Sequence, residues 1–363
     1  AGYYAPFELG GIEDEPGQYL TDRLTDFAEE FITENQDKPF FLYLSHFAVH
    51  DPIQGRSDLV GKYSQKLASV EEPNTPSFIL EGNPDDLQPL NSARLAFLNN
   101  QSTHQDYKVL PDRTVKIKQH QDNVEFAAMV ESMDESLGRI VDHLEELGLT
   151  DNTLIVFFSD NGGMSGANFG GASRIVDPSR LNSAFSTSNL PLRGAKGWLY
   201  EGGIRVPMIV KWPEKFADSD RVIEEPVIST DFYPSLLEMA GLPMDYGQAL
   251  DGVSFVPALN GDSFDRGPIF WHFPQYSNHG MQSPGGAIRL GDYKLLEYFE
   301  NDTVQLFNLR EDIGELNDLS RSEPNKAEEL ISLLHAWREE VSAQMPPENP
   351  NYDPSQYPHS SSL

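Results

Sequence analysis

The residues of this chain best suited to chemistry follow apolar stretches. The segment TLIVFFSDNGG, residues 153–163, runs from such a stretch into Asp160, Asn161 and two glycines. A carboxylate and an amide supply adjacent hard oxygens of the kind that Ca²⁺ and Mg²⁺ prefer, and glycine allows close approach of the backbone. The same four residues also favour a turn for its own sake. The pattern therefore indicates either part of a cation site or an Asx-type turn.

A histidine and a cationic loop extend this pattern. His50 follows the apolar run 40–47, and LPLRGAKGWLYEGGIRVP, residues 190–207, places Arg193, Lys196 and Arg205 among glycines. Ammonium, guanidinium and backbone N–H groups together can cradle an anion. Lys196 is suited to neutralise charge that develops on a leaving oxygen. The alternative is a structural histidine beside surface cations in a turn-rich loop.

Helices and strands must position these side chains. Apolar residues recur at helical spacing over 19–35 and 123–147, and each segment leads into an apolar run, 40–47 or 152–160, typical of a buried strand. This order predicts an α/β fold with a mainly parallel or mixed sheet flanked by helices. Ligands of such sheets bind beyond the carboxyl ends of the strands, so His50 and Asp160 are expected at one crevice.

Other segments complete the predicted architecture. Residues 204–212 predict a strand, and residues 231–241 predict a helix that begins at Asp231 as its cap. Residues 67–120, rich in Pro, Asn, Gln and Asp, predict an irregular excursion with short helical pieces. The stretches 286–299 and 303–309 predict antiparallel strands, followed by a helix over 323–344. We therefore expect an α/β domain over 1–260, a small α+β subdomain with an antiparallel sheet over 261–345, and an extended tail over 346–363.

The composition narrows the classes of function. The chain has 57 acidic and 26 basic residues, a net charge of −31, so general electrostatic binding of nucleic acid is excluded. No run approaches the ~18 apolar residues of a membrane span. Cysteine is absent, which excludes disulfides, thiolate metal sites and a cysteine nucleophile within these residues. An anionic substrate would need a metal ion or local cations to overcome the acidic field.

Several long motifs resemble one family. PFFLYLSHFAVHDPIQ, VESMDESLGRIVDHLEELGLTDNTLIVFFSDNGG and PLRGAKGWLYEGGIRVPMIVKWP resemble, in order, segments of the formylglycine-dependent sulfatases of the alkaline-phosphatase superfamily. AIRLGDYKLLEYFENDTVQLFNLREDIGELNDLS is similar to the small carboxy-terminal domain of those enzymes. The resemblance covers most of residues 19 to about 340 and implies an alkaline-phosphatase-like fold.

The resemblance also implies roles for individual residues. Asp160 and Asn161 would supply part of a Ca²⁺ shell, with Ca²⁺ favoured over Mg²⁺. Lys196 and His50 would contact the sulfate and assist the leaving group. Arg193 is a further candidate for binding substrate, as part of the anion cradle that the cationic loop predicts. The implied reaction is hydrolysis of a sulfate ester, of a sulfated carbohydrate or an aryl sulfate, by a hydrated formylglycine. His104, His272 and His279 are candidates for sugar contacts or for structural roles.

One part of the family pattern is missing. The family's nucleophile lies in a C-x-P-S-R or S-x-P-S-R motif near the amino terminus. The one Pro-Ser-Arg here lies in DPSR, Asp177–Arg180, which follows residues 153–163 and has no Cys or Ser at the position that is converted to formylglycine. We expect the formylglycine, derived from Cys or Ser, on an amino-terminal segment outside this chain, so that the chain alone is inactive. No signal peptide is visible; family and composition suggest a periplasmic or extracellular protein.

Two alternatives remain from the sequence. A phosphodiesterase or phosphonate hydrolase of the same superfamily would share much of this architecture. A non-catalytic, sulfatase-like binding protein would also lack a nucleophile.

Overall fold

The computed structural model describes residues 2–7, 10–11, 15–82, 92–100, 114–166, 184–216, 221–244, 247–277 and 282–351. The helices are α1 (Leu20–Asn35), α2 (Ser57–Ala68), α3 (Ser92–Asn99), α4 (Val124–Glu146), α6 (Glu201–Ile204), α7 (Phe232–Met239), α8 (Val256–Asn260) and α9 (Pro324–Glu340). The strands are β1 (Phe78–Gly82), β2 (Thr114–Lys118), β3 (Ile155–Phe158), β4 (Met208–Lys211), β5 (Ile269–Phe273), β6 (Gly285–Leu290), β7 (Tyr293–Tyr298) and β8 (Val304–Asn308).

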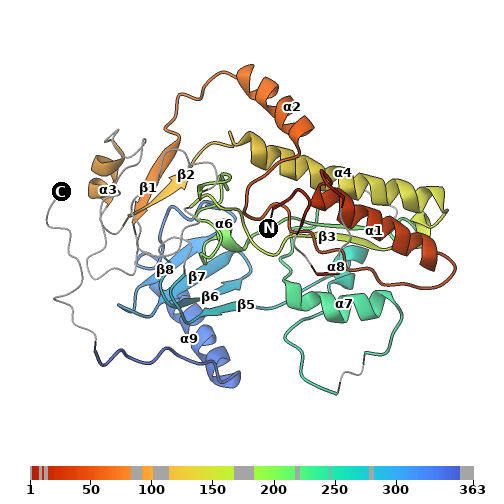
Figure 1. Ribbon diagram of the computed structural model, residues 1–363. Helices are drawn as coiled ribbons and strands as arrows, with labels where there is room; N and C mark the ends of the chain where they lie inside the picture. Colours follow the sequence, from red (N-terminus) through yellow and green to blue (C-terminus); the bar gives the residue numbers. More distant parts are fainter. Residues whose placement is uncertain are drawn as a thin grey trace.

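The long helices α1 and α4 lie side by side, and α2 packs on α4 (Figure 1). Asn123 caps α4, because its side chain accepts hydrogen bonds from Glu125 N and Phe126 N. Strand β3 follows α4 and pairs with β4 in antiparallel register. The predicted helices over 19–35 and 123–147 and the predicted strands within 152–160 and 204–212 are therefore confirmed, although the described pairing of β3 is antiparallel.

The carboxy-terminal half contains the predicted antiparallel sheet, in the order β5-β6-β7-β8, with α9 against one face (Figure 1). Alternation along the strands explains the two faces, since neighbouring residues of a strand point to opposite sides. Ile288, Leu295 and Leu306 pack with Leu330 and Leu334 of α9. Ala287, Leu296 and Phe307 point to the opposite face and pack with Trp198 and Tyr200 of the cationic loop.

The prediction of a buried strand over 40–47 is wrong for this structure. The segment is extended, but the residues from Phe40 to His46 make no backbone–backbone hydrogen bond with the described residues. Partly buried and exposed side chains alternate along it, and Phe41 and Tyr43 are 74% and 81% exposed. One face therefore rests on the protein, but a strand is buried only when neighbours also cover its edges and its second face.

Two further predictions need correction. Residues 67–120 contain the antiparallel strand pair β1–β2, which the polar composition of the region hides. Asp231 precedes α7, but its side chain does not cap that helix. Its carboxylate instead accepts two hydrogen bonds from Arg266 and others from Ile228 N and Val253 N, because it is fully buried and needs compensating donors.

No helix in the described part of the chain is long and apolar enough to cross a membrane.

Candidate functional site

The turn after β3 and the loop that carries Lys196 are joined through their backbones. Lys196 N donates to Gly163 O at 3.1 Å, and Gly162 N donates to Gly203 O at 3.0 Å. The predicted cation ligands Asp160 and Asn161 directly precede the two glycines. The structure thus places four of the five predicted site residues on this connected pair of segments, since Arg193 lies on the same loop as Lys196.

The backbones at this junction approach so closely that a side chain larger than that of glycine would not fit. A Cβ atom on Gly162 would lie 1.8 Å from Gly202 O, and a Cβ atom on Gly203 would lie 2.2 Å from Trp198 O. Gly194 and Gly197 flank the lysine turn with φ of +79° and +83°, a region that favours glycine. Gly162 therefore serves the contact between the two segments, whereas Gly203 serves close packing of the backbone within the lysine loop.

Asn189 ties the junction together and was missed from the sequence. Its Nδ2 lies 2.8 Å from Gly163 O, 3.0 Å from Gly202 O and 3.2 Å from Gly194 O. One amide group thus shares two N–H donors among three carbonyl groups on both segments. Its position in the turn sequence SNLP gave no signal, because asparagine is common in turns.

Lys196 is partly exposed at the tip of its loop, whereas its neighbours Ala195 and Trp198 are buried. Arg193 has a different environment. Its Nε donates to Glu81 at 2.9 Å, a second nitrogen donates to Glu315 O at 2.9 Å, and its guanidinium lies 4.2 Å from the centre of the Tyr200 ring. Burial alone would lower the pKa of Arg193, but Tyr200 and Glu81 raise it on balance.

These contacts give Arg193 a role in holding the loop, because its guanidinium is committed to internal partners. The substrate contact of Arg193 stays a prediction, and the proposed function does not depend on it.

His50 lies in an exposed turn at some distance along the chain from these segments. Its Nδ1 is 2.9 Å from Asp51 O, and the Tyr3 hydroxyl donates to His50 O at 3.0 Å. Within the described ranges no hydrogen bond or ion pair links His50 to the β3 turn or to the lysine loop. Its participation in the site stays a prediction.

The other candidate histidines are not brought to the site. His272 Nε2 contacts Gln344 O at 2.8 Å, a structural contact at the edge of the antiparallel sheet. His104 and His279 lie outside the described residues, as does the segment Asp177–Arg180.

The chain offers a partial set of ligands for a cation. Asp160 is exposed. The amide nitrogen of Asn161 donates to Gly162 O at 3.0 Å, and its amide oxygen accepts no hydrogen bond from the described part of the chain. These oxygens fit a hard cation, but Ca²⁺ takes six to eight of them. No group of three or more His, Asp or Glu side chains among the described residues is placed to hold a metal. Further ligands would have to come from elsewhere.

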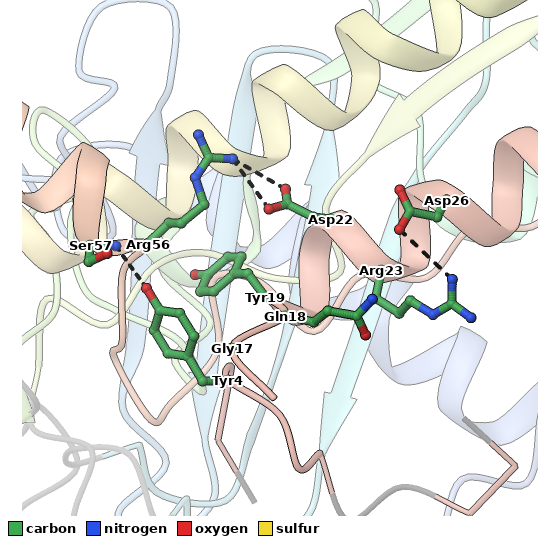
Figure 2. A pocket seen from close by; sticks show the side chains of 9 residues that line it. All are labelled: Tyr4, Gly17, Gln18, Tyr19, Asp22, Arg23, Asp26, Arg56 and Ser57. Atoms are coloured by element: carbon green, nitrogen blue, oxygen red, sulfur yellow. Dashed lines mark hydrogen bonds and ion pairs between the residues drawn. The ribbon is translucent and has the colours of Figure 1, made fainter. Parts of the chain in front are cut away.

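A polar cavity of about 270 Å³ opens beside the start of α1 (Figure 2). Arg56 lies 3.3 Å from Asp22, and Ser57 N donates to the Tyr4 hydroxyl at 2.7 Å. Burial raises the pKa of Asp22, against the opposing effect of Arg56. None of the predicted site residues lines this cavity, and its arginine is already paired, so we assign it no part in the reaction.

The described part of the chain is an α/β protein in which a carboxylate and an amide at the end of a strand are joined, through the backbone, to a glycine-flanked lysine loop. Residues 2–242 match the profile of the family described as Sulfatase, and residues 195–344 match that described as N-sulphoglucosamine sulphohydrolase, C-terminal. The chain belongs to the sulfatase family.

Individual relatives agree with this assignment. A sulfatase of Formosa agariphila is 30% identical over 350 residues, which cover 90% of this chain and 51% of that protein. The crystal structure of Ps i-CgsB in complex with k-i-k-neocarrahexaose is 28% identical, with a TM-score of 0.61 over 90% of this chain and 56% of that one. The likeness confirms the predicted α/β, alkaline-phosphatase-like fold class.

A more distant structure, BT4656 in complex with its substrate D-glucosamine-2-N,6-O-disulfate, is 20% identical with a TM-score of 0.64 over 92% of this chain and 72% of that one. At this identity it supports the fold alone. The chain spans about half the length of the Formosa protein and of Ps i-CgsB.

Proposed function

We propose that this chain forms part of an enzyme that hydrolyses sulfate esters of carbohydrates. The observation that supports the proposal is the backbone hydrogen bond of 3.1 Å from Lys196 N to Gly163 O, which joins the lysine loop to the turn that begins with Asp160 and Asn161. In this proposal the Lys196 ammonium and a bound cation provide a local positive site on a protein of net charge −31. An anionic substrate needs such a site.

Each residue has a role in this proposal. The Lys196 ammonium binds a sulfate oxygen and stabilises the negative charge on the ester oxygen as the S–O bond breaks. Asp160 and Asn161 would supply two of the oxygen ligands of a Ca²⁺ ion, which when bound would neutralise charge on the sulfate oxygens. His50 hydrogen-bonds to the sulfate or to the leaving oxygen. The nucleophile is a formylglycine on a segment outside these 363 residues.

The choice of a carbohydrate substrate is supported by Ps i-CgsB, which is 28% identical to this chain and whose structure holds k-i-k-neocarrahexaose. The chemistry proposed for Lys196 would suit an aryl sulfate equally, so the carbohydrate part of the proposal rests on this neighbour.

The test uses the complete gene product that carries this chain. It is assayed with 4-nitrophenyl sulfate and a panel of sulfated oligosaccharides, before and after chelation by EDTA and after addition of Ca²⁺. We expect release of sulfate, its loss with EDTA and its recovery with Ca²⁺. Lys196→Met should lower kcat by roughly 10²-fold or more, the size found when one transition-state donor is removed.

Lys66→Met is the matched control, since Lys66 is an exposed lysine in the last turn of α2. It should leave kcat unchanged. A preference for 4-nitrophenyl phosphate or a phosphonate ester would favour a phosphodiesterase or phosphonate hydrolase instead. Binding of sulfated sugar without turnover would favour a non-catalytic protein.

A further inference from the structure

The loop that carries Lys196 rests on the carboxy-terminal sheet. Leu199 and Tyr200 are 5% and 1% exposed, and they belong to one apolar cluster with Leu296, Tyr298 and Phe307 of β7 and β8. Polar contacts reinforce this packing, since Leu199 N donates to Gln282 at 2.9 Å and the Tyr200 hydroxyl donates to Gln305 at 2.6 Å. The lysine therefore projects from a loop whose base is formed by another part of the chain.

A buried cluster of charged groups lies at the same interface. Lys294 Nζ is 2.9 Å from Glu201 Oε1 and 2.9 Å from Glu315 Oε1, and all three side chains are 0–2% exposed. Glu201 begins α6, at the end of the lysine loop, whereas Lys294 and Glu315 belong to β7 and the turn after β8. An ammonium removed from water this completely is stable only when such partners compensate for its lost hydration.

Glu315 contacts both ends of the lysine loop. Its carboxylate accepts a hydrogen bond from Glu201 N at 2.7 Å, and its backbone carbonyl accepts one from Arg193 at 2.9 Å. Residues 193 and 201 enclose Lys196. Glu315 therefore bridges the two ends of the loop from the carboxy-terminal sheet region, in addition to the direct hydrogen bond of 2.6 Å from Gly202 N to Arg193 O.

The backbone of Glu315 is also unusual. Its φ is +51°, in the left-handed region where a glycine would be at ease and a glutamate is strained. The turn alone does not explain why this residue is a glutamate. The contacts of its fully buried carboxylate with Lys294 and with Glu201 N do.

We propose that Glu315 and Lys294 are positioning residues for Lys196, acting through Arg193 and Glu201. The catalytic role of Lys196 rests on the proposed function, but the claim that Glu315 and Lys294 position its loop does not. It states that the carboxy-terminal sheet sets the conformation of residues 193–204, and hence the place of the ammonium relative to the turn after β3.

The variant Glu315→Gly tests this claim. Glycine relieves the left-handed strain, so a residue that serves only the turn should be replaced without harm. Asp302→Gly is the matched control, because Asp302 is an exposed residue of the same sheet with φ of +55° in the turn between β7 and β8. Both variants relieve a left-handed residue, and only the first removes contacts to the lysine loop.

Hydrogen exchange of this chain, followed by mass spectrometry, supplies the measurement. In Glu315→Gly we expect exchange in peptides covering 193–204 to accelerate about tenfold or more, with α9 unchanged. Asp302→Gly should match the wild type in both. Glu315→Gln, which keeps an acceptor for Glu201 N, should lie between wild type and Glu315→Gly.

Lys294→Met is the second variant, since it leaves the turn at Glu315 untouched, and it should loosen the same peptides. Loop exchange within twofold of wild type in Glu315→Gly and Lys294→Met would overturn the proposal. Equal acceleration in the loop and in α9 would do the same, because it would show a general loss of stability. This readout does not use catalysis, so absence of sulfatase activity would refute the proposed function and leave the positioning result intact.

Discussion

The tightest contact of the candidate site is the one at Gly162, and Gly162→Ala tests it directly. An alanine Cβ would lie 1.8 Å from Gly202 O, whereas real Cβ atoms stay at least 3.0 Å from such atoms, so the backbones must separate by 3.0 − 1.8 = 1.2 Å. The obstructing atom is a backbone oxygen, which cannot swing away as a side chain can.

The magnitude follows from the bonds at the junction. Separation by that amount would stretch the hydrogen bond from Gly162 N to Gly203 O, now 3.0 Å, to about 4.2 Å, beyond any useful interaction. Overpacking costs roughly 1–3 kcal/mol and a buried group left unpaired roughly 1–3 kcal/mol. We therefore expect Gly162→Ala to lower the free energy of unfolding by roughly 2–6 kcal/mol.

The assay is equilibrium unfolding in urea, with Gly138→Ala as the control. Gly138 lies inside α4, and a Cβ atom there would meet nothing within 4 Å. Alanine in a helix interior is preferred over glycine by about 0.5–1 kcal/mol, so this variant should be more stable than wild type. The same chemical change is thus predicted to have opposite signs at two positions.

A change smaller than about 0.5 kcal/mol at Gly162, the usual range of surface substitutions, would refute the close approach of the two segments. In the complete gene product, Gly162→Ala should also lower kcat by roughly 10²-fold, because a displacement of about 1 Å is enough for such a loss.

Three further predictions concern the frame around the site. Asp231→Ala should lower the free energy of unfolding by about 3–5 kcal/mol, since it strands the buried Arg266; urea denaturation measures this, and a near-neutral result would contradict the buried pair. Burial lowers the pKa of His46 from its ordinary 6.5. The imidazole of His46 therefore binds a proton more readily in the unfolded chain than in the folded one, so the free energy of unfolding should fall as the pH drops below about 6.5 toward the folded pKa. His46→Gln should reduce this loss of stability, measured by thermal unfolding between about pH 5 and 7.5. An unchanged pH profile would exclude His46 as its source. Tyr43→Ser should change the stability of this chain by less than about 0.5 kcal/mol, because Tyr43 is 81% exposed; a loss of several kcal/mol would show that the segment 40–47 is buried after all.

Periodicity in the sequence predicted much of the framework. The long helices α1 and α4 have strong apolar faces, and β3 is a short apolar run between clear boundaries, so each was found from local pattern. The antiparallel strand pair β1–β2 was missed, because its strands lie in a polar, proline-rich region and pair across a long sequence separation. The error over 40–47 has the opposite cause: an apolar run predicts burial, but burial also requires a partner that covers it.

The site shows the same division. Asp160, Asn161 and Lys196 could be selected from residue type and neighbouring glycines, whereas the contacts of Arg193 with Glu81 and Glu315 could not be foreseen, because these partners are far away in sequence. Lys294 did leave a signal. It shares the inward face of β7 with Leu296 and Tyr298 at a spacing of two residues, an unusual place for a lysine.

The amino-acid sequence by itself determined the family, the long helices and the residue types able to hold an anion and a cation, because these depend on local order and on motifs that are contiguous along the chain. Only the tertiary structure decided that the SDNGG turn and the lysine loop touch, that Asn189 joins them, and that the carboxy-terminal sheet supports the loop. Such contacts join residues tens of positions apart, and their distances are set by the packing of the whole chain.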